Sequence, residues 1–239
     1  MSRVANGDIA PVVQLQILAD FEGDFGRHAP ARLVERMRMV WRSVPSQLAR
    51  ENRRFVYGAV RQGARAKDLE ETIQWLRDYG VVTKVPRVKA LRCPLSGYED
   101  LSAFKLYALD VGLLGALSEL PPAVVLDGSR LFTECKGALT KQYALQELLT
   151  QGRRPFYWSA EQATAEVDFA VDEGTGVIPL EVKTSENLKA KSLRVAREAF
   201  DLKRCVRTSL SAYRDEGWIV NVPLWALSQL SCAYAGDRN

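Results

Sequence analysis

Apolar residues recur three or four positions apart along the first third of the chain, a spacing typical of helices that bury one face. Four helices are predicted from this spacing, over residues 12–24, 32–42, 55–61 and 68–79. In the last of them, Leu69, Ile73 and Leu76 share one face. Asp68 is placed to cap its first turn, and Gly80 to end it. The pattern therefore predicts a helical N-terminal part.

Residues 81–91 then alternate between apolar and polar positions, which predicts a two-stranded β hairpin. Three helices followed by a hairpin is the order of elements in a winged helix. Residues 100–117 are mostly apolar again and predict a further helix. We therefore expect a helical or winged-helix domain over 1–95 and a helical linker over 96–130.

The remaining chain, 131–239, carries short runs of β-branched and aromatic residues between two predicted helices. The helices are expected over 137–151 and 188–204, and the strands over 155–159, 166–171, 176–183 and 205–210. A helix, a three-stranded meander, a helix and a strand form a compact α/β unit. The predicted fold class is therefore α/β (α+β), with a helical first part and this α/β unit as the second domain.

The composition restricts the chemistry. The single histidine, His28, excludes histidine-rich zinc sites, paired-histidine metalloprotease motifs and two-histidine nuclease centres. The four cysteines form no Cys-x-x-Cys pair, so neither a zinc knuckle nor a redox motif is expected. Acid–base or metal chemistry must therefore rest on carboxylates and lysines.

Four residues of the second part are candidates for one site. Glu181 and Lys183 flank one residue and point to the same face of their strand, while Asp168 lies on the preceding strand. Glu147 lies on the helix before the meander. Two carboxylates from adjacent strands can hold Mg²⁺, which polarises a phosphodiester and activates water. We expect Asp168 and Glu181 as metal ligands, with Lys183 and Glu147 in support. An exposed strand edge with a surface ion pair would give the same Glu-Val-Lys pattern.

Several short stretches also match one protein family in order. They are Gln16–Asp20, Asp24-Phe25, His28–Pro30, Phe104–Leu114, Gly137–Tyr143, Phe156–Ser159, Glu166–Phe169 and Pro179–Lys183. Over residues 10–230 the chain resembles the C-terminal region of bacterial and archaeal AAA+-type ATP-binding proteins. The resemblance implies a winged helix followed by a PD-(D/E)XK, restriction-endonuclease-like domain of unknown function. Asp168, Glu181 and Lys183 would then be its core site residues, and Glu166 and Glu147 auxiliaries.

The chain departs from that family in two respects. It contains no Gly-x-x-x-x-Gly-Lys-Ser/Thr phosphate loop, so we expect neither ATP binding nor ATPase activity from this chain. Either the ATPase half is missing from this sequence, or the protein is a naturally shortened relative of the family, with an ATPase domain or partner supplied in trans. The second departure is Lys141, which stands where the family often has an acid and cannot ligate a metal.

The formal charge of +4 is unevenly divided. Residues 1–95 hold 17 basic and 10 acidic residues, and residues 96–239 hold 16 and 19, so the balances are +7 and −3. Clustered cations can meet DNA phosphates, although a solvated charged face is at least as common. The expected DNA contacts are Arg36, Arg42, Arg53, Arg54, Lys189, Lys191 and Arg194. The predicted recognition helix, 68–79, is instead acidic on its exposed side.

No run of eighteen apolar residues and no secretion signal is present, so we expect a cytoplasmic protein without a membrane partner. Two functions remain open. One is a Mg²⁺-dependent phosphodiesterase, an endonuclease acting on DNA. The other is a non-catalytic module that binds nucleic acid or protein through an inactive nuclease-like scaffold.

Overall fold

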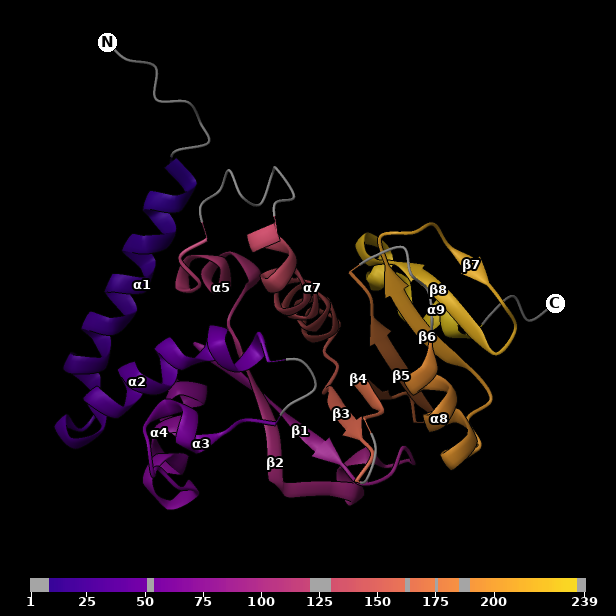
Figure 1. Ribbon diagram of the computed structural model, residues 1–239, viewed down its shortest axis with the longest axis horizontal. Coiled ribbons are helices and arrows are strands. Elements are labelled where there is room, and N and C mark those ends of the chain that lie inside the picture. Colours follow the sequence, from indigo (N-terminus) through magenta and orange to yellow (C-terminus); the bar gives the residue numbers. More distant parts are fainter. Residues whose placement is uncertain are drawn as a thin grey trace, which may run out of the picture. The chain divides into compact units, whose positions relative to one another are not determined.

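The computed structural model describes residues 9–50, 54–120, 130–161, 164–174, 176–184 and 190–235 (Figure 1). The chain divides into two compact units. The helical unit consists of Met1–Lys84 and Leu106–Gln142, and the sheet unit of Val85–Lys105 and Tyr143–Asn239. The described part contains no helix long and apolar enough to cross a membrane.

The helical unit is built mainly from α1 to α5 and the first part of α7. These helices are α1 (Ile9–His28), α2 (Ala31–Leu48), α3 (Tyr57–Val60), α4 (Ala66–Asp78), α5 (Val111–Leu117) and α7 (Arg130–Thr150). Helix α2 packs against α1 and α4, and α1 packs against α5 (Figure 1). The apolar face of α2 is fully buried at Leu33, Met37, Val40 and Trp41. The helices expected from the apolar spacing are therefore present.

Helix α4 confirms the predicted apolar face and the predicted end. Leu69, Ile73 and Leu76 are buried, and the chain leaves the helix through Gly80, whose φ of 85° is readily adopted only by glycine. The predicted cap is wrong. The helix begins two residues earlier, so Asp68 lies inside the first turn and its carboxylate accepts the backbone N–H of Arg65 at 2.9 Å.

Two other local predictions are corrected. Helix α2 continues past its predicted end at residue 42 and through Pro45 to Leu48. Buried Val44 and Gln47 extend the packed face of the helix, so tertiary contacts outweigh the local cost of the proline. The predicted helix over 100–117 is a strand, β2 (Glu99–Ala108), followed by α5. Residues 103–108 are all buried and, except for Lys105, apolar, and such a run does not distinguish a strand from a helix.

The strands form one mixed eight-stranded sheet in the order β2-β1-β3-β4-β5-β6-β8-β7. Its strands are β1 (Val82–Val88), β2, β3 (Phe156–Ser159), β4 (Glu166–Asp172), β5 (Val177–Val182), β6 (Cys205–Ser209), β7 (Arg214–Asp215) and β8 (Ile219–Pro223). Strands β3, β4 and β5 form the predicted antiparallel meander. Strand β6 runs parallel to β5, and β8 runs parallel to β6. The chain is therefore mixed α/β, as predicted.

Helix α8 (Lys191–Phe200) provides the crossover that parallel β5 and β6 require. Its buried residues, Leu193 and Ala196, join the apolar core of the sheet unit with Phe156 and Trp158. Strand β8 is followed by a short 3₁₀ helix, Leu224–Gln229, and α9 (Leu230–Ala235).

The predicted hairpin over residues 81–91 holds only one strand, β1. Its neighbour in the sheet is β2, which follows a 3₁₀ turn over Leu95–Tyr98. On its other side β1 pairs in parallel with β3, with Arg87 opposite Tyr157. The strand expected to lie in a wing is thus part of the large sheet.

Candidate functional site

The register of β4 and β5 brings the two predicted metal ligands together. Phe169 lies opposite Leu180, and continuing this antiparallel register by one residue places Asp168 opposite Glu181 on the same face. The backbone N–H of Val182 donates to Asp168 Oδ2 at 2.9 Å. Lys183 Nζ lies 2.8 Å from Glu181 Oε1. The structure therefore gathers Asp168, Glu181 and Lys183 into one cluster, the carboxylate pair with its lysine.

Both carboxylates are buried, with Asp168 6% and Glu181 5% exposed. Burial raises the pKa of Glu181; Lys183 and Arg207 oppose the rise, and the nearby charge of Asp168 adds to it. Among the described residues, Glu181 Oε2 is buried and has no hydrogen-bond partner. Burying a carboxylate oxygen without a hydrogen-bond partner costs free energy, so Glu181 Oε2 is suited to bind a further ligand.

Two carboxylates fit a particular kind of metal. Mg²⁺ is commonly held by one or two protein carboxylates and keeps several of its waters, so Asp168 and Glu181 suit it. A metal enclosed entirely by protein ligands does not fit. In the part of the chain that the structure describes, no three His, Cys, Asp or Glu side chains are grouped to hold a metal ion.

Arg207 is a member of the site that sequence reasoning missed. It lies on β6 directly opposite Glu181, it is 1% exposed, and its Nε donates to Asn221 Oδ1 at 3.2 Å. Its Nη2 lies 3.2 Å from Glu216 Oε1. In the sequence it follows the predicted helix over 188–204, which carries the expected DNA contacts Lys189, Lys191 and Arg194. The available signal was a charge in the middle of the predicted buried strand 205–210.

A second buried ion pair lies on β4, two residues before Asp168. Lys105 of β2 bonds Glu166, and both side chains are almost fully buried. Lys105 Nζ also lies 4.7 Å from the centre of the Tyr157 ring. Glu166, implied by the family resemblance as an auxiliary, thus bonds a lysine that the sequence did not single out. Lys105 was missed because its segment was expected to be a helix.

The remaining predicted site residue, Glu147, lies half-buried on α7. Its carboxylate is a hydrogen-bond partner of Tyr143, one turn earlier on the same helix. Burial and the charge of Glu147 hold the pKa of the Tyr143 phenol above its ordinary value. A role for Glu147 beside Asp168 and Glu181 remains a prediction.

The expected phosphate contacts of the helical unit differ in availability. Arg42 forms a two-pronged ion pair with Glu22 at 2.8 and 2.6 Å. Arg36 donates to the carbonyl oxygen of Asp68 at 3.2 Å. Arg54 is exposed, whereas Arg53 lies outside the described residues.

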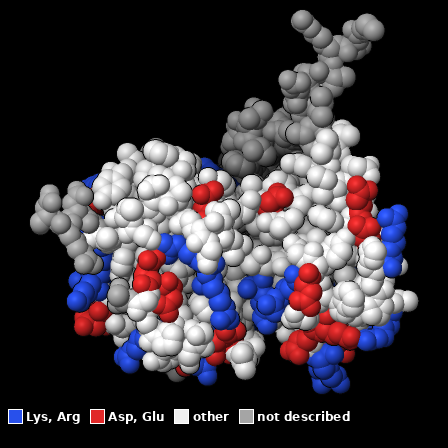
Figure 2. All heavy atoms as spheres, turned by 180° about the vertical axis from the view of Figure 1, so that it is seen from behind, with Lys and Arg blue, Asp and Glu red and all other residues white. Residues whose placement is uncertain are grey.

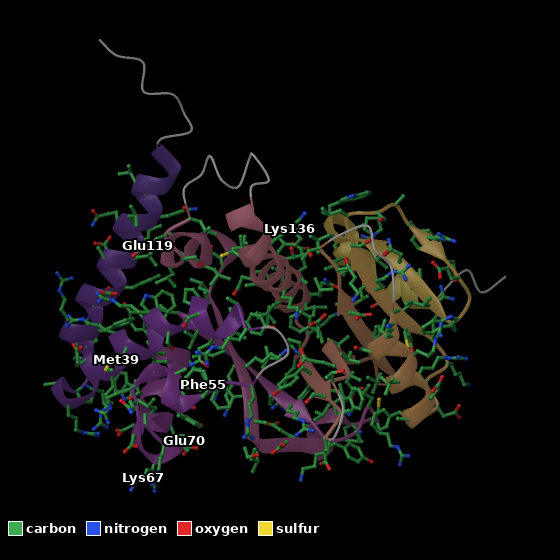
Figure 3. All side chains as sticks on the ribbon, viewed as in Figure 1. Met39, Phe55, Lys67, Glu70, Glu119 and Lys136 are labelled. Carbon is green, nitrogen blue, oxygen red and sulfur yellow. The ribbon has the colours of Figure 1, made fainter. Side chains whose placement is uncertain are left out.

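The surface of α4 is acidic, as expected. Lys67 and Glu70 are exposed and point away from the helix, as Figure 3 shows. Glu71 is held by Arg32, at 2.6 and 2.7 Å. Its exposed acids make this helix unsuited to lie against phosphates.

On the sheet unit, Lys191 and Arg194 are exposed on α8, and Lys189 lies outside the described residues. The Arg194 and Arg197 guanidinium carbons lie 5.9 and 5.5 Å from the Trp218 ring centre. The ring therefore stabilises two cations that remain open to solvent. Elsewhere basic and acidic side chains are interspersed, as on the face in Figure 2.

Comparison with known proteins adds two family matches. Residues 2–123 match the family described as Domain of unknown function (DUF8612), and residues 136–227 match Domain of unknown function (DUF4143). The first match spans half of the chain. Searches of the curated proteins and of the solved structures found no match.

Proposed function

The chain belongs to the DUF8612 family, and from the geometry of its sheet we propose that its second part is a PD-(D/E)XK-like, Mg²⁺-dependent phosphodiesterase acting on DNA. The order of α7, the meander β3-β4-β5, α8 and parallel β6 supports this proposal, because it is the order expected for that fold. The DUF4143 match also agrees with the family resemblance, since such domains are commonly associated with AAA-type ATPases. For the first part of the chain, the proposal retains the winged-helix fold that the family resemblance implies.

The observation that carries the proposal is Glu181 Oε2, a buried oxygen that lies beside Asp168 and has no hydrogen-bond partner among the described residues. Asp168 and Glu181 would hold the metal, which supplies a Lewis acid that lowers the pKa of a bound water. Lys183, whose side chain is 29% exposed, is the most accessible member of the cluster. It is placed to orient the attacking water or to stabilise negative charge on the phosphate.

In the sheet unit, the exposed Lys191 and Arg194 of α8 would contact DNA phosphates, and each phosphate contact adds affinity that falls with salt. In the helical unit, taken by itself, Arg54 is an exposed candidate for a phosphate contact. Arg42 contributes less in this proposal, because its guanidinium is already occupied by Glu22.

The test is a calorimetric titration with Mg²⁺ or Mn²⁺, followed by a plasmid-nicking assay. We expect the native chain to bind metal and to nick DNA. Asp168→Asn and Glu181→Gln should each weaken metal binding by more than about a hundredfold, because loss of an outer-shell partner alone costs ten- to a hundredfold. Nicking should be lost with it.

Asp172→Asn is the matched control. It removes a carboxylate at the end of the same strand, β4, that accepts the N–H of Gly174 in the following turn and the N–H of the distant Leu95. This variant should bind metal and nick DNA like the native chain. A native chain that binds no metal would contradict the proposal.

A second candidate is a non-catalytic module that binds DNA or protein, with an ATPase domain or partner supplied in trans. The observation that favours it is that carboxylates at and near the site already have cationic partners. Glu166 bonds Lys105, and Glu181 lies 2.8 Å from Lys183 and near the charge of Arg207. These cations reduce the attraction of the carboxylates for a divalent cation. Salt-dependent DNA binding without cleavage would support this candidate.

A further inference from the structure

A row of polar residues crosses the sheet from the carboxylate pair to the sheet edge. Glu181 lies opposite Arg207, Arg207 opposite Asn221, and Asn221 opposite Arg214. Residues directly opposite each other on neighbouring strands point to the same face. We call these four residues the polar row; they come from β5, β6, β8 and β7 in spatial order.

Side-chain contacts join the members of the polar row. Glu216 Oε1 lies 3.2 Å from Arg207 Nη2 and 3.4 Å from Arg214 Nε, so one carboxylate bridges the two arginines. Asn221 Nδ2 donates to two backbone carbonyls of the loop before β7, at 3.1 and 2.8 Å. The loop that leads to Arg214 is thus fixed to the strand next to Arg207.

The polar row changes from buried to exposed along its length. The Arg207 side chain is 2% exposed, whereas that of Arg214 is 67% exposed. Three strand spacings of about 4.8 Å place Arg214 about 14 Å from Glu181. Along its axis a duplex rises about 3.4 Å per nucleotide, so a duplex lying with its axis along the polar row would span about four nucleotides over this distance.

We propose that Arg214 binds a backbone phosphate of DNA at the sheet edge, several nucleotides away from the phosphate held at Asp168 and Glu181. This inference rests on the proposed function and adds a second contact between the protein and the DNA. The guanidinium has five N–H donors in a fixed fork that matches a phosphate, and Glu216 occupies only one side of it. A phosphate can therefore bind Arg214 from the solvent side.

The charge of Glu216 should affect DNA binding in the direction opposite to that of Arg214. Its carboxylate competes with a phosphate for Arg214 and repels the phosphate directly. Removing this charge should therefore tighten DNA binding, whereas removing the Arg214 charge should weaken it. Two substitutions two residues apart are expected to shift the affinity in opposite directions.

The experiment measures the binding of a short fluorescein-labelled DNA duplex by anisotropy, without divalent metal and over a series of salt concentrations. Arg214→Ala should weaken binding several-fold at low salt and reduce the slope of log K against log salt by about 0.9. Glu216→Gln should tighten binding several-fold. Arg92→Ala is the control, an exposed arginine on the loop after β1, and should leave the slope unchanged.

The inference is wrong if Arg214→Ala behaves like Arg92→Ala, or if the native chain does not bind the duplex at all. Neither result bears on metal binding by Asp168 and Glu181, which is measured separately, so failure of this inference and failure of the metal site are distinguishable. If Glu216→Gln lowers the melting temperature by disturbing Arg207, Arg214→Glu takes its place. Charge reversal at this exposed position should weaken binding more than Arg214→Ala does, and equal affinities would overturn the inference.

Discussion

The two units bury different kinds of polar group. Among the described residues, the buried polar side chains of the helical unit are all neutral: Ser43, Gln47, Thr72 and Gln142. The sheet unit buries five charged residues: Lys105, Glu166, Asp168, Glu181 and Arg207. The helical unit keeps its ion pairs at the surface, as in Arg32 with Glu71 and Arg42 with Glu22.

This difference bears on whether folding requires buried charged side chains. Burying an ion costs several kcal/mol, which an ion pair only partly offsets. The helical unit forms its core without this cost, so a chain of this composition does not need buried charge in order to fold. Charges that are retained at such a cost are the better candidates for function, which directs attention to the sheet unit.

The largest effect is expected for Lys105→Met, which tests whether the sheet unit depends on its buried ion pair. The variant leaves the Glu166 carboxylate buried without its ion-pair partner, and removing one member of a buried pair typically costs about 3–5 kcal/mol. For a chain of this size we expect thermal unfolding at a temperature lower by more than about 6 °C.

The double variant Lys105→Met/Glu166→Leu supplies the control. It replaces both charges with apolar side chains of similar volume, and such exchanges are often neutral or stabilising. We expect it to recover most of the lost stability. A double variant as unstable as Lys105→Met alone would show that packing at Lys105, rather than its charge, stabilises the sheet unit.

A smaller effect is expected for Glu181→Gln. Because the pKa of Glu181 is raised in the folded chain, its ionised form destabilises the fold at pH values above that raised pKa. The neutral amide removes this penalty, so the variant should melt higher than the native chain near neutral pH. The gain should shrink as the pH falls through the raised pKa and vanish below the unfolded pKa of about 4.3.

With added Mg²⁺ the native chain should melt at a higher temperature than Glu181→Gln, because only the native chain would then be stabilised by bound metal. Melting temperatures measured across this pH range, with and without Mg²⁺, test both parts. A gain that persists in full at low pH would show that Glu181→Gln acts through packing instead of charge.

The meander and much of the site could be predicted from the sequence, because they depend on residues that are close together in the chain. Strands β3, β4 and β5 are short apolar runs separated by turns, and a period of two places Glu181 and Lys183 on one face. Asp168 follows because a short turn folds β4 back onto β5. Each of these relationships spans only a few residues.

The rest of the site depends on relationships that are not local. Arg207 faces Glu181 only because α8 carries the chain back to a parallel strand, and the hydrophobic pattern does not state that register. Lys105 reaches Glu166 from a strand that lies 61 residues away in the sequence. That strand has buried residues on both faces, so it lacks the alternation by which strands are recognised.

The smallest effect is expected in the helical unit, from Arg42→Ala. Arg42 meets Glu22 with two hydrogen bonds, yet its side chain is 65% exposed, and water already screens the pair. Surface pairs of this kind contribute about 0–1 kcal/mol, so the melting temperature should fall by at most about 4 °C. High salt should shrink this loss further, whereas the loss in Lys105→Met should persist, because buried pairs are screened much less. Thermal unfolding of both variants at low and high salt compares the two units directly. Equal losses with equal salt dependence would mean that the units do not differ in how they use charge.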